Sequence, residues 1–235
     1  MEKERKRLVV SSEGMYLLTN LLCALGVAVV TAADFGVSMI VAPAYILSLK
    51  VPFLTFGQAE YVVQGLLFIV LCFLMKKVKL IYFASFNTCF LYGAFLDLWR
   101  LIIPAFSPEV IAAGSTPLPL RIVYFVFGTL LTQAAVALYF RIYIYPQVYE
   151  FFIKCASVRF KTDTTKVKIV YDFTSLTLSV VMTLLFFGKF TGIGVGTIVT
   201  TFVNGVGIGF FGKVIDRYLE FCPSFPKLAS IFDYQ

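Results

Sequence analysis

The stretch that decides the fold is MYLLTNLLCALGVAVVTAA at residues 15–33, followed by DFGVS at 34–38 and by the shorter apolar run MIVAPAYILSL at 39–49. A run as long as 15–33 can cross a ~30 Å hydrocarbon core as a helix, whereas 39–49 is too short to cross. The membrane-facing part of the chain therefore begins with a full span, a break and a half-span.

Further long apolar runs follow this start, at 57–75, 80–103, 118–141, 168–188 and 192–212. The sequence is 60% hydrophobic and only 14% charged, which excludes a water-soluble domain of this length. In lipid every backbone N–H and C=O needs an internal partner, so runs this long form helices. Barrel strands would be shorter and would alternate in polarity. The sequence predicts an all-α membrane protein with six transmembrane helices.

The order of these segments repeats along the chain. The span 118–141 is followed by a short segment at 146–157 and then by two more spans, as in the first part. A shift of roughly 110 residues also aligns a few identical residues in the two parts. The aligned residues are Thr88 with Thr200, Phe90 with Phe202, and Gly93 with Gly205. Each unit holds an odd number of crossings, so we expect an inverted repeat, as in many secondary transporters. The half-spans 39–49 and 146–157 are either re-entrant or interfacial.

Positive charge is distributed unevenly between the two sides of this topology. Of the 20 basic residues, all but Lys50, Arg100, Arg121 and Lys189 fall on the side of the two termini. Cytoplasmic loops carry such an excess, so both termini are predicted to be cytoplasmic. The predicted parts are a tail at 1–14, a first repeat at 15–103, an extracytoplasmic loop at 104–117, a second repeat at 118–212 and a tail at 213–235. The juxtamembrane charges favour anionic lipid as a partner and disfavour nucleic acid.

The residues of common catalytic sites are missing from the sequence. It contains no histidine, and its 5 cysteines form no CxxC pair. Neither a GxSxG nor an HExxH motif occurs. We therefore expect no enzyme activity, no cofactor and no metal site.

Several motifs resemble one bacterial family. The run ALGVA at 24–28, leading into ADFG at 33–36, resembles the first-helix motif of the YczE-like membrane proteins, which are distantly related to the YitT family. The runs GAFLD at 93–97, KVKIVYD at 166–172, FFG at 186–188 and GIGVGTI at 192–198 resemble further motifs of these proteins. The chain departs from them at Ala32, where lysine is common, and at Gln64, where asparagine is expected. The resemblance covers about residues 15–212 and implies a multi-pass protein of the bacterial inner membrane, without naming a substrate.

Polar residues within spans are the candidates for a substrate site, because such residues are costly in lipid. They are Gln64, Asn87, Asp172 and Asn204. Asp172 is the strongest candidate, since Gln64 occupies the position related to it by the repeat. An ion pair with Lys168, one turn earlier, is the alternative role for Asp172. Hydrogen bonds between helices are the alternative for the two asparagines.

Carboxylates near the ends of spans are candidates for ion or proton coupling. Asp34 lies at the break after the first span, where it either couples to an ion or caps the following segment. Asp172 is a second coupling candidate. Glu60 lies one turn into the second span and either contacts a substrate or pairs with Lys50 or Arg100 at the outer rim. We further expect an ion pair between Asp97 and Arg100 beside the interfacial Trp99.

Glycines in the spans predict close helix packing or gating. The pairs Gly192/Gly196 and Gly205/Gly209 have small-xxx-small spacing, and Gly93 lies in the third span. A phosphate-binding loop is excluded because no Lys–Ser/Thr follows these glycines.

The function predicted from these features is a small secondary transporter of an unidentified small solute, working by alternating access. The alternative is a non-transporting regulator or scaffold that docks a cytoplasmic partner or lipid through 154–168 and 213–235. Glu150, Lys154 and nearby tyrosines either line an inner mouth or lie at the lipid headgroups. The predicted partners are the bilayer and the solute, and a homodimer is compatible with the sequence.

Overall fold

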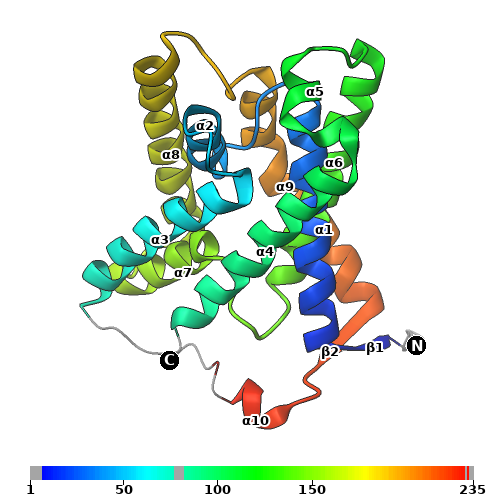
Figure 1. Cartoon of the computed structure of the whole chain (residues 1–235). Helices are drawn as coiled ribbons and strands as arrows, with labels where there is room; N and C mark the ends of the chain where they lie inside the picture. The colour runs from blue at the N-terminus through cyan, green and yellow to red at the C-terminus, as the bar shows by residue number, and fades with distance from the viewer. Residues whose placement is uncertain (1–6, 77–81, 231, 233–235) are drawn as a thin grey trace.

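The computed structural model describes residues 7–76, 82–230 and 232 and is mostly helical (Figure 1). The long helices are α1 (Ser12–Ala32), α3 (Phe56–Met75), α4 (Phe83–Ile102), α6 (Leu118–Tyr139), α8 (Thr164–Phe187) and α9 (Val195–Tyr218). Two shorter helices, α2 (Ala42–Lys50) and α7 (Val148–Phe160), follow α1 and α6. The described chain thus contains both the long and the short segments that the hydrophobic runs predict.

Local sequence signals explain where several helices begin and end. Ser11 caps α1 by accepting a hydrogen bond from the backbone N–H of Gly14. Thr55 and Gln58 form a capping box at the start of α3, each side chain bonding the backbone of the other residue. Asp34 has a φ of 53°, so the chain turns sharply after α1 instead of continuing as a helix.

Five of the helices are long and apolar enough to cross a membrane: α1, α3, α6, α9 and residues Lys166–Phe187 of α8. Helix α4 is as long as α3 but carries Asn87, Asp97 and Arg100. Among the residues that the structure describes, large apolar side chains such as Phe173, Phe202 and Val206 are exposed. Exposed apolar surface on this scale fits a lipid environment, so the five helices indicate a multi-pass membrane protein.

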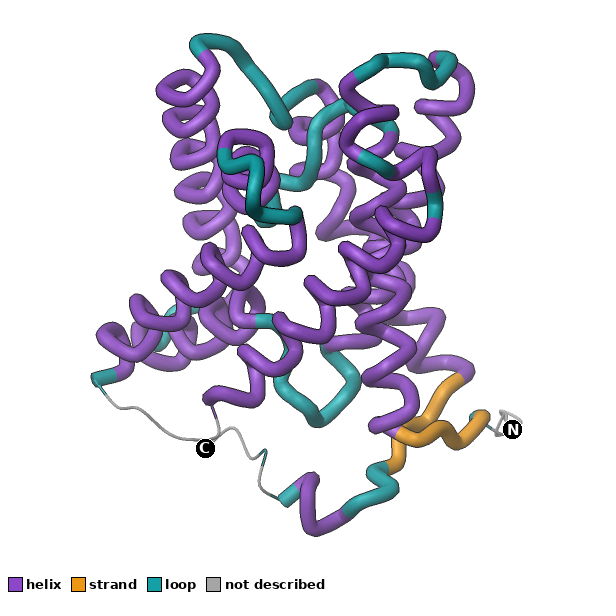
Figure 2. Tube along the Cα trace, in the orientation of Figure 1, coloured by secondary structure: helices purple, strands orange, loops and turns teal. Residues whose placement is uncertain are grey.

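The two ends of the helical region meet in a small parallel sheet. Strand β1 (Leu8–Ser11) pairs with β2 (Leu219–Cys222), and Figure 2 shows the two strands together at one end of the molecule. Helix α10 (Pro226–Ala229) lies beyond β2. The short helices η2 (Pro104–Phe106) and α5 (Pro108–Ala112) lie at the opposite end (Figure 1). Helix α1 therefore starts at the same end of the molecule at which α9 finishes.

The centre of the core is the crossing of α1 and α6. A Cβ added to Gly26 would lie 2.4 Å from Oγ1 of Thr132, and one added to Gly128 would lie 2.8 Å from Cγ2 of Val30. Real Cβ atoms do not approach other atoms this closely, so both positions need glycine for the helices to meet. Small residues bring helix backbones into contact in this way within membranes.

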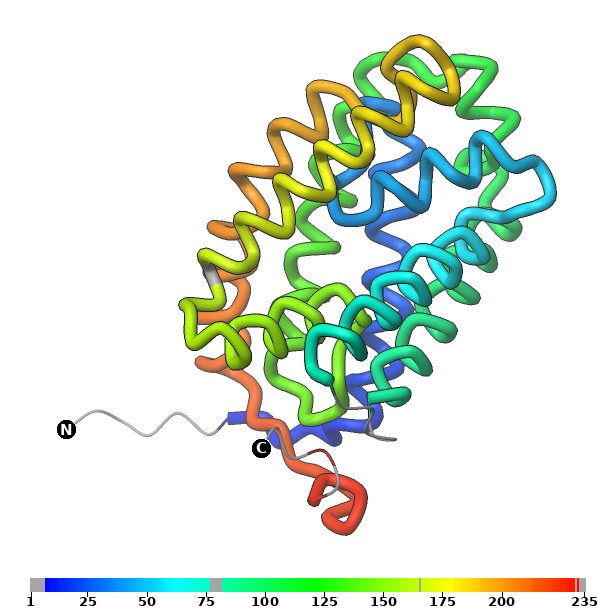
Figure 3. Tube along the Cα trace, turned by 90° about the vertical axis from the view of Figure 1, so that its left-hand side faces the viewer, coloured from blue at the N-terminus to red at the C-terminus, as the bar shows by residue number. Residues whose placement is uncertain are grey.

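The helix contacts around this crossing follow the same pattern in two units of the chain, α1–α4 and α6–α9. Helix α1 packs on α4 as α6 packs on α9, and α2 packs on α8 as α7 packs on α3. Thr88 Oγ1 donates to the carbonyl of Tyr145 at 2.8 Å, and Thr197 Oγ1 donates to the carbonyl of Val37 at 2.7 Å. In each case a threonine in the last helix of one unit, α4 or α9, donates to the linker that precedes the short helix of the other unit, α7 or α2. Figures 1 and 3 show α2 nearer to the α5 end and α7 nearer to the β1–β2 end.

One pair of helices breaks this correspondence. Helices α3 and α4 pack closely, because Gly57 and Gly93 face each other: a Cβ on Gly57 would lie 2.2 Å from the Gly93 carbonyl oxygen. Helices α8 and α9 make few contacts with each other within the described part of the chain. The second unit is therefore more open than the first.

Candidate functional site

A cavity of about 300 Å³ lies among α1, α4, α6, α7, α8 and α9. Most of its wall comes from residues after 130, and the linkers before α2 and α7 complete it. Pockets for small molecules start at about this volume. The cavity therefore has the size to hold a small solute.

One side of the cavity reaches the protein surface at the turn between α7 and α8. Thr164 and Lys154 line it there and are exposed, and the half-buried Lys168 lies beside them. Glu150 also lines the cavity, and burial raises its pKa to about 7, while the positive charge of Lys168 acts in the opposite direction. The two lysines make this mouth the most positive part of the cavity wall.

Deeper in the cavity the polar groups are amides and phenols. Gln133 on α6 donates from Nε2 to Oδ1 of Asn204 on α9 at 3.2 Å, and both residues line the cavity. Gly207 leaves the room for this contact, because a Cβ at that position would lie 1.8 Å from Gln133 Oε1. Tyr139 OH donates to Oδ1 of Asn20 at 2.8 Å. These hydrogen bonds fix the orientation of the Gln133 and Tyr139 side chains in the cavity wall.

Two polar atoms of the wall are left without a partner. The hydroxyl of Tyr92, whose side chain is 1% exposed, and Oε2 of Glu150 are both buried and make no hydrogen bond to any described residue. Unpaired buried polar atoms are costly. Both atoms are therefore suited to bond a polar group of a bound solute.

Behind the wall lies a second polar cluster, which joins α3 to the start of α7. Glu60 Oε2 accepts hydrogen bonds from Gln64 Nε2 at 3.0 Å and from Tyr149 OH at 2.8 Å. The same amide group of Gln64 donates to Gln147 Oε1 at 3.1 Å, and Gln64 Oε1 accepts from the Val148 N–H at 3.2 Å. Gln147 and Tyr149 also line the cavity, so this cluster connects α3 to the cavity wall.

The structure brings only some of the predicted substrate residues to the cavity. Asn204 lines it directly, and Gln64 reaches it through Gln147. Asp172 is not part of the cavity wall but forms an ion pair with Lys168, at 3.1 Å between Nζ and Oδ2. Asn87 is exposed on the outer surface of α4. The predicted residues therefore do not all meet in one place.

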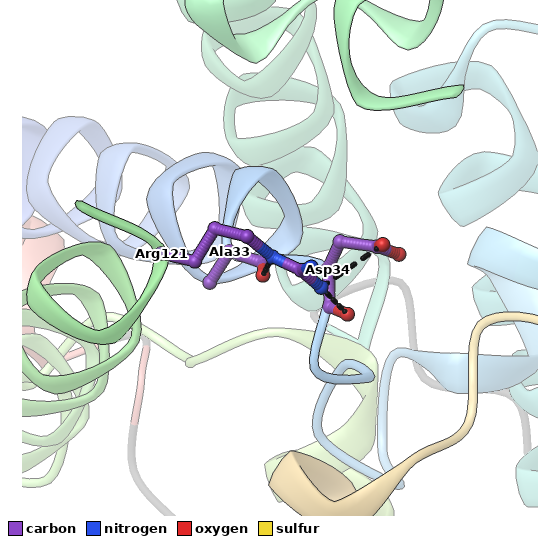
Figure 4. A network of polar contacts seen from close by, with 3 residues as sticks. All are labelled: Ala33, Asp34 and Arg121. Atoms are coloured by element: carbon purple, nitrogen blue, oxygen red, sulfur yellow. Dashed lines mark hydrogen bonds and ion pairs between the residues drawn. The ribbon is translucent and has the colours of Figure 1, made fainter. Parts of the chain in front are cut away.

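Asp34, a predicted coupling residue, lies outside the cavity at the end of α1 (Figure 4). Arg121 on α6 bonds its carboxylate at 3.1 Å and also bonds the carbonyl oxygens of Ala33 at 2.8 Å and Asp34 at 2.6 Å. The guanidinium group stacks over the Phe35 ring, 4.8 Å from its centre. This contact joins the end of α1 to the start of α6.

The predicted glycines divide into two groups. Gly93, Gly192 and Gly196 each lie where an added Cβ would come within 3 Å of another residue. Gly205 and Gly209 have nothing within 4 Å of an added Cβ among the described residues. The close approaches on the second half of α9 fall instead at Gly207, against Gln133, and at Gly212, against Arg141.

The ion pair expected between Asp97 and Arg100 is absent from the described residues, and so is a pairing of Glu60 with Lys50 or Arg100, which was one of its two predicted roles. Asp97 accepts hydrogen bonds from Thr55 and from the Gly57 N–H, and it thereby caps α3 instead of pairing with Arg100. Glu60 belongs to none of the three ion pairs found among the described residues, because α3 turns it inward to Tyr149.

Sequence reasoning missed Tyr92, Gln133 and Gln147 as wall residues, and for Glu60 it left open both contact with a substrate and pairing at the outer rim. The two glutamines carried a usable signal, because each is an uncharged polar residue in an apolar segment, Gln133 in 118–141 and Gln147 in 146–157. Tyr92 carried none, since tyrosines are frequent in this chain and its buried position depends on the packing of α4 against α1.

These features define a helical multi-pass membrane protein with a cavity among its helices, lined by both apolar and polar side chains. The chain belongs to the DUF6198 family, a family of unknown function whose sequence profile matches residues 10–213. The match spans all of the long helices except the last few residues of α9. Searches of curated proteins and of solved structures found no match to the chain.

Proposed function

We propose that this protein is a small secondary transporter that moves a small solute by alternating access. The observation that carries this proposal is the cavity of about 300 Å³, which lies where the two helical units meet and reaches the surface at the α7–α8 turn. Its wall combines apolar side chains with amides, phenols and two unpaired polar atoms. Such a wall suits a solute that binds and leaves again.

Alternating access requires two units that can rock against each other, and we propose that α1–α4 and α6–α9 are inverted repeats. The exchanged contacts of Thr88 with Tyr145 and of Thr197 with Val37 support this relation. The opposite positions of α2 and α7 also support it, because inverted repeats place related elements on opposite sides of the membrane.

We further propose six crossings, with α4 as the sixth. The parallel pairing of β1 with β2 supports an even number, because it holds the start of α1 and the end of α9 at one end of the molecule. The basic residues Lys154, Lys213 and Arg217 flank that end, which supports a cytoplasmic location for both termini. A location in the bacterial inner membrane follows from the resemblance to YczE-like proteins and is proposed on that ground alone.

Solute counterflow in proteoliposomes, with a broad library of metabolites, tests the transport proposal. The Gly207→Val variant should lose flux, because its side chain would displace Gln133 and fill the cavity. Gly205→Val is the matched control on the same helix, since an added Cβ there meets nothing within 4 Å. A folded wild-type protein that moves nothing in the library, or flux that survives in Gly207→Val, would contradict the proposal.

Labelling with a membrane-impermeant maleimide tests the crossings. Cys222 in β2 and a cysteine introduced at the exposed Glu109 in α5 should react from opposite sides of the membrane. A cysteine introduced at Val9 in β1 should react from the same side as Cys222. Labelling of positions 9 and 222 from different sides would exclude an even number of crossings.

A further inference from the structure

Glu60 is the most deeply buried carboxylic acid of the described chain, with no exposed surface. It lies in α3, one of the helices long and apolar enough to cross a membrane. Its Oε2 is bonded by Gln64 and Tyr149, and its Oε1 has no partner among the described residues. An acidic group in this position is costly to keep, so a functional role is the default expectation.

Among the described residues, the groups around Glu60 offer no positive charge. The titratable groups that interact with it are Tyr149 and Glu150 on α7, Cys89 and Tyr92 on α4, Cys23 on α1 and Tyr171 on α8. None of them is a cation, and Glu60 forms none of the three ion pairs found within the described ranges. A carboxylate without a counter-ion is strongly disfavoured at such a site.

Glu60 is also connected mechanically to the cavity. Its partner Tyr149 lies in the first turn of α7, and Gln64 joins Glu60 to Gln147, the residue directly before that helix. Gln147 in turn lies over Cys23 in the cavity wall, at 4.0 Å between Nε2 and Sγ. Gln147 and Tyr149 thus belong both to the contact between α7 and α3 and to the cavity wall.

We propose that Glu60 is the proton-binding site of this protein and that proton release from Glu60 accompanies the movement of α7 away from α3. The O–H bond of the acid breaks and the proton passes to water that enters as α7 leaves. The reverse step forms the O–H bond again and allows α7 to dock. The proposal rests on the proposed transport function, in which this step couples solute movement to a proton gradient.

This assignment differs from the sequence prediction of Asp34 and Asp172 as coupling residues. Asp34 is paired with Arg121 and Asp172 with Lys168, so each carboxylate already has a counter-ion. Glu60 has no counter-ion among the described residues, and its partner Tyr149 lines the cavity.

The test uses Cys23 as the only cysteine, after replacement of Cys72, Cys89, Cys155 and Cys222, in protein reconstituted in liposomes. N-ethylmaleimide is the probe, and its reaction rate with Cys23 is measured between acidic and alkaline pH. The rate of any thiol rises with pH, so the Glu60→Gln variant, which stays uncharged, provides the baseline. We expect the wild-type rate to rise more steeply with pH than this baseline, because Gln147 leaves Cys23 when Glu60 loses its proton.

Three controls make the result specific to Glu60. The Asp34→Asn variant should keep the wild-type pH dependence. The Glu150→Gln variant should also keep the wild-type pH dependence. Loss of that dependence in Glu150→Gln would assign the effect to Glu150 and overturn the proposal. Tyr149→Phe keeps the ring but removes a bond to Glu60 Oε2, so the pH at which labelling rises should move upward. This variant also provides a test if Glu60→Gln does not fold.

Two outcomes separate this proposal from the transport proposal. If wild-type and Glu60→Gln proteins show the same pH dependence of labelling, while solute flux is present, Glu60 is not the coupling site and transport still stands. If the labelling differs as expected but no solute of the library moves, the transport proposal fails. Infrared spectra provide an independent check, because the carbonyl absorption of protonated carboxylic acids should lose the contribution of one group in Glu60→Gln.

Discussion

The two helical units carry the same order of long and short helices but place different chemistry at their centres. In the first unit, α3 holds Glu60 and Gln64 fully buried against α7. In the second, the matching helix α8 holds Lys168 and Asp172 as a partly exposed ion pair beside the cavity mouth. The first unit thus supplies a buried polar pair without an ion-pair partner among the described residues, and the second supplies an ion pair near water.

The two units also differ in how tightly their helices pack. Helices α3 and α4 are held together by facing glycines, whereas α8 and α9 are separated and the cavity is lined mostly by the second unit. The comparison suggests that the first unit is a rigid wall, while the second unit moves around it. Substitutions at matched positions of the two units can break or sharpen this view.

The largest effect is expected at the α3–α4 crossing. Gly57→Leu forces a side chain to within 2.2 Å of the Gly93 carbonyl oxygen, which is backbone and cannot rotate away. We expect a loss of about 3 kcal/mol or more in unfolding free energy, as for severe overpacking. The free energy of unfolding is measured in mixed micelles with increasing SDS. Gly209→Leu in α9, where an added Cβ meets nothing within 4 Å, should change stability by less than about 0.5 kcal/mol. Equal stability of the two variants would refute the difference in packing.

The next effect concerns the contacts that tie the units together at their two ends. Arg121→Ala removes the ion pair with Asp34 and bonds to two backbone carbonyls, and we expect a loss of about 2 kcal/mol. At the other end Tyr143 OH donates to Glu13 Oε1 at 2.7 Å, and Tyr143→Phe should cost about 1 kcal/mol. Thermal unfolding in detergent compares them, with the exposed Lys189→Ala as a neutral control. A smaller loss for Arg121→Ala than for Tyr143→Phe would contradict this order.

A third prediction tests whether Thr88 and Thr197 make equivalent contacts in the two units. Thr88→Val and Thr197→Val keep the shape of each side chain but remove the hydrogen bonds to the Tyr145 and Val37 carbonyls. Each should cost about 1 kcal/mol, and the double variant should cost nearly the sum, because the two sites are far apart. Thermal unfolding of the single and double variants measures it. A large loss in only one of the two would indicate that the units are not equivalent at these positions.

The sequence predicted the helices well, because the apolar runs are long and their breaks are marked by Asp, Gly and Pro residues. The runs 15–33, 57–75 and 118–141 correspond to α1, α3 and α6 within a few residues. The short segments 39–49 and 146–157 correspond to α2 and α7. The run 80–103 includes residues outside the described ranges, and its described part forms α4.

The sequence did not predict which side of each helix is buried. A helix that is apolar on all sides gives no sign of which side is buried. Gly205 and Gly209 have the spacing of a packing motif, yet Gly207 is the glycine that meets Gln133. Pairing at the outer rim was one of the two roles left open for Glu60, because it lies one turn into its span, but its burial depends on α7, which follows far later in the chain.

The smallest effect is expected for the Lys168–Asp172 pair, which is where the sequence placed its strongest site candidate. The side chains are 33% and 19% exposed, so the pair should contribute only about 0.2–0.5 kcal/mol to stability. A double-mutant cycle with Lys168→Met and Asp172→Asn, measured by thermal unfolding, isolates this coupling. Because Lys168 lines the cavity and Asp172 does not, solute binding should be weakened by the lysine variant more than by the aspartate variant. If Asp172→Asn alone abolishes binding while the coupling stays small, Asp172 contacts the solute directly, and the charged centre of the second unit is part of the binding site.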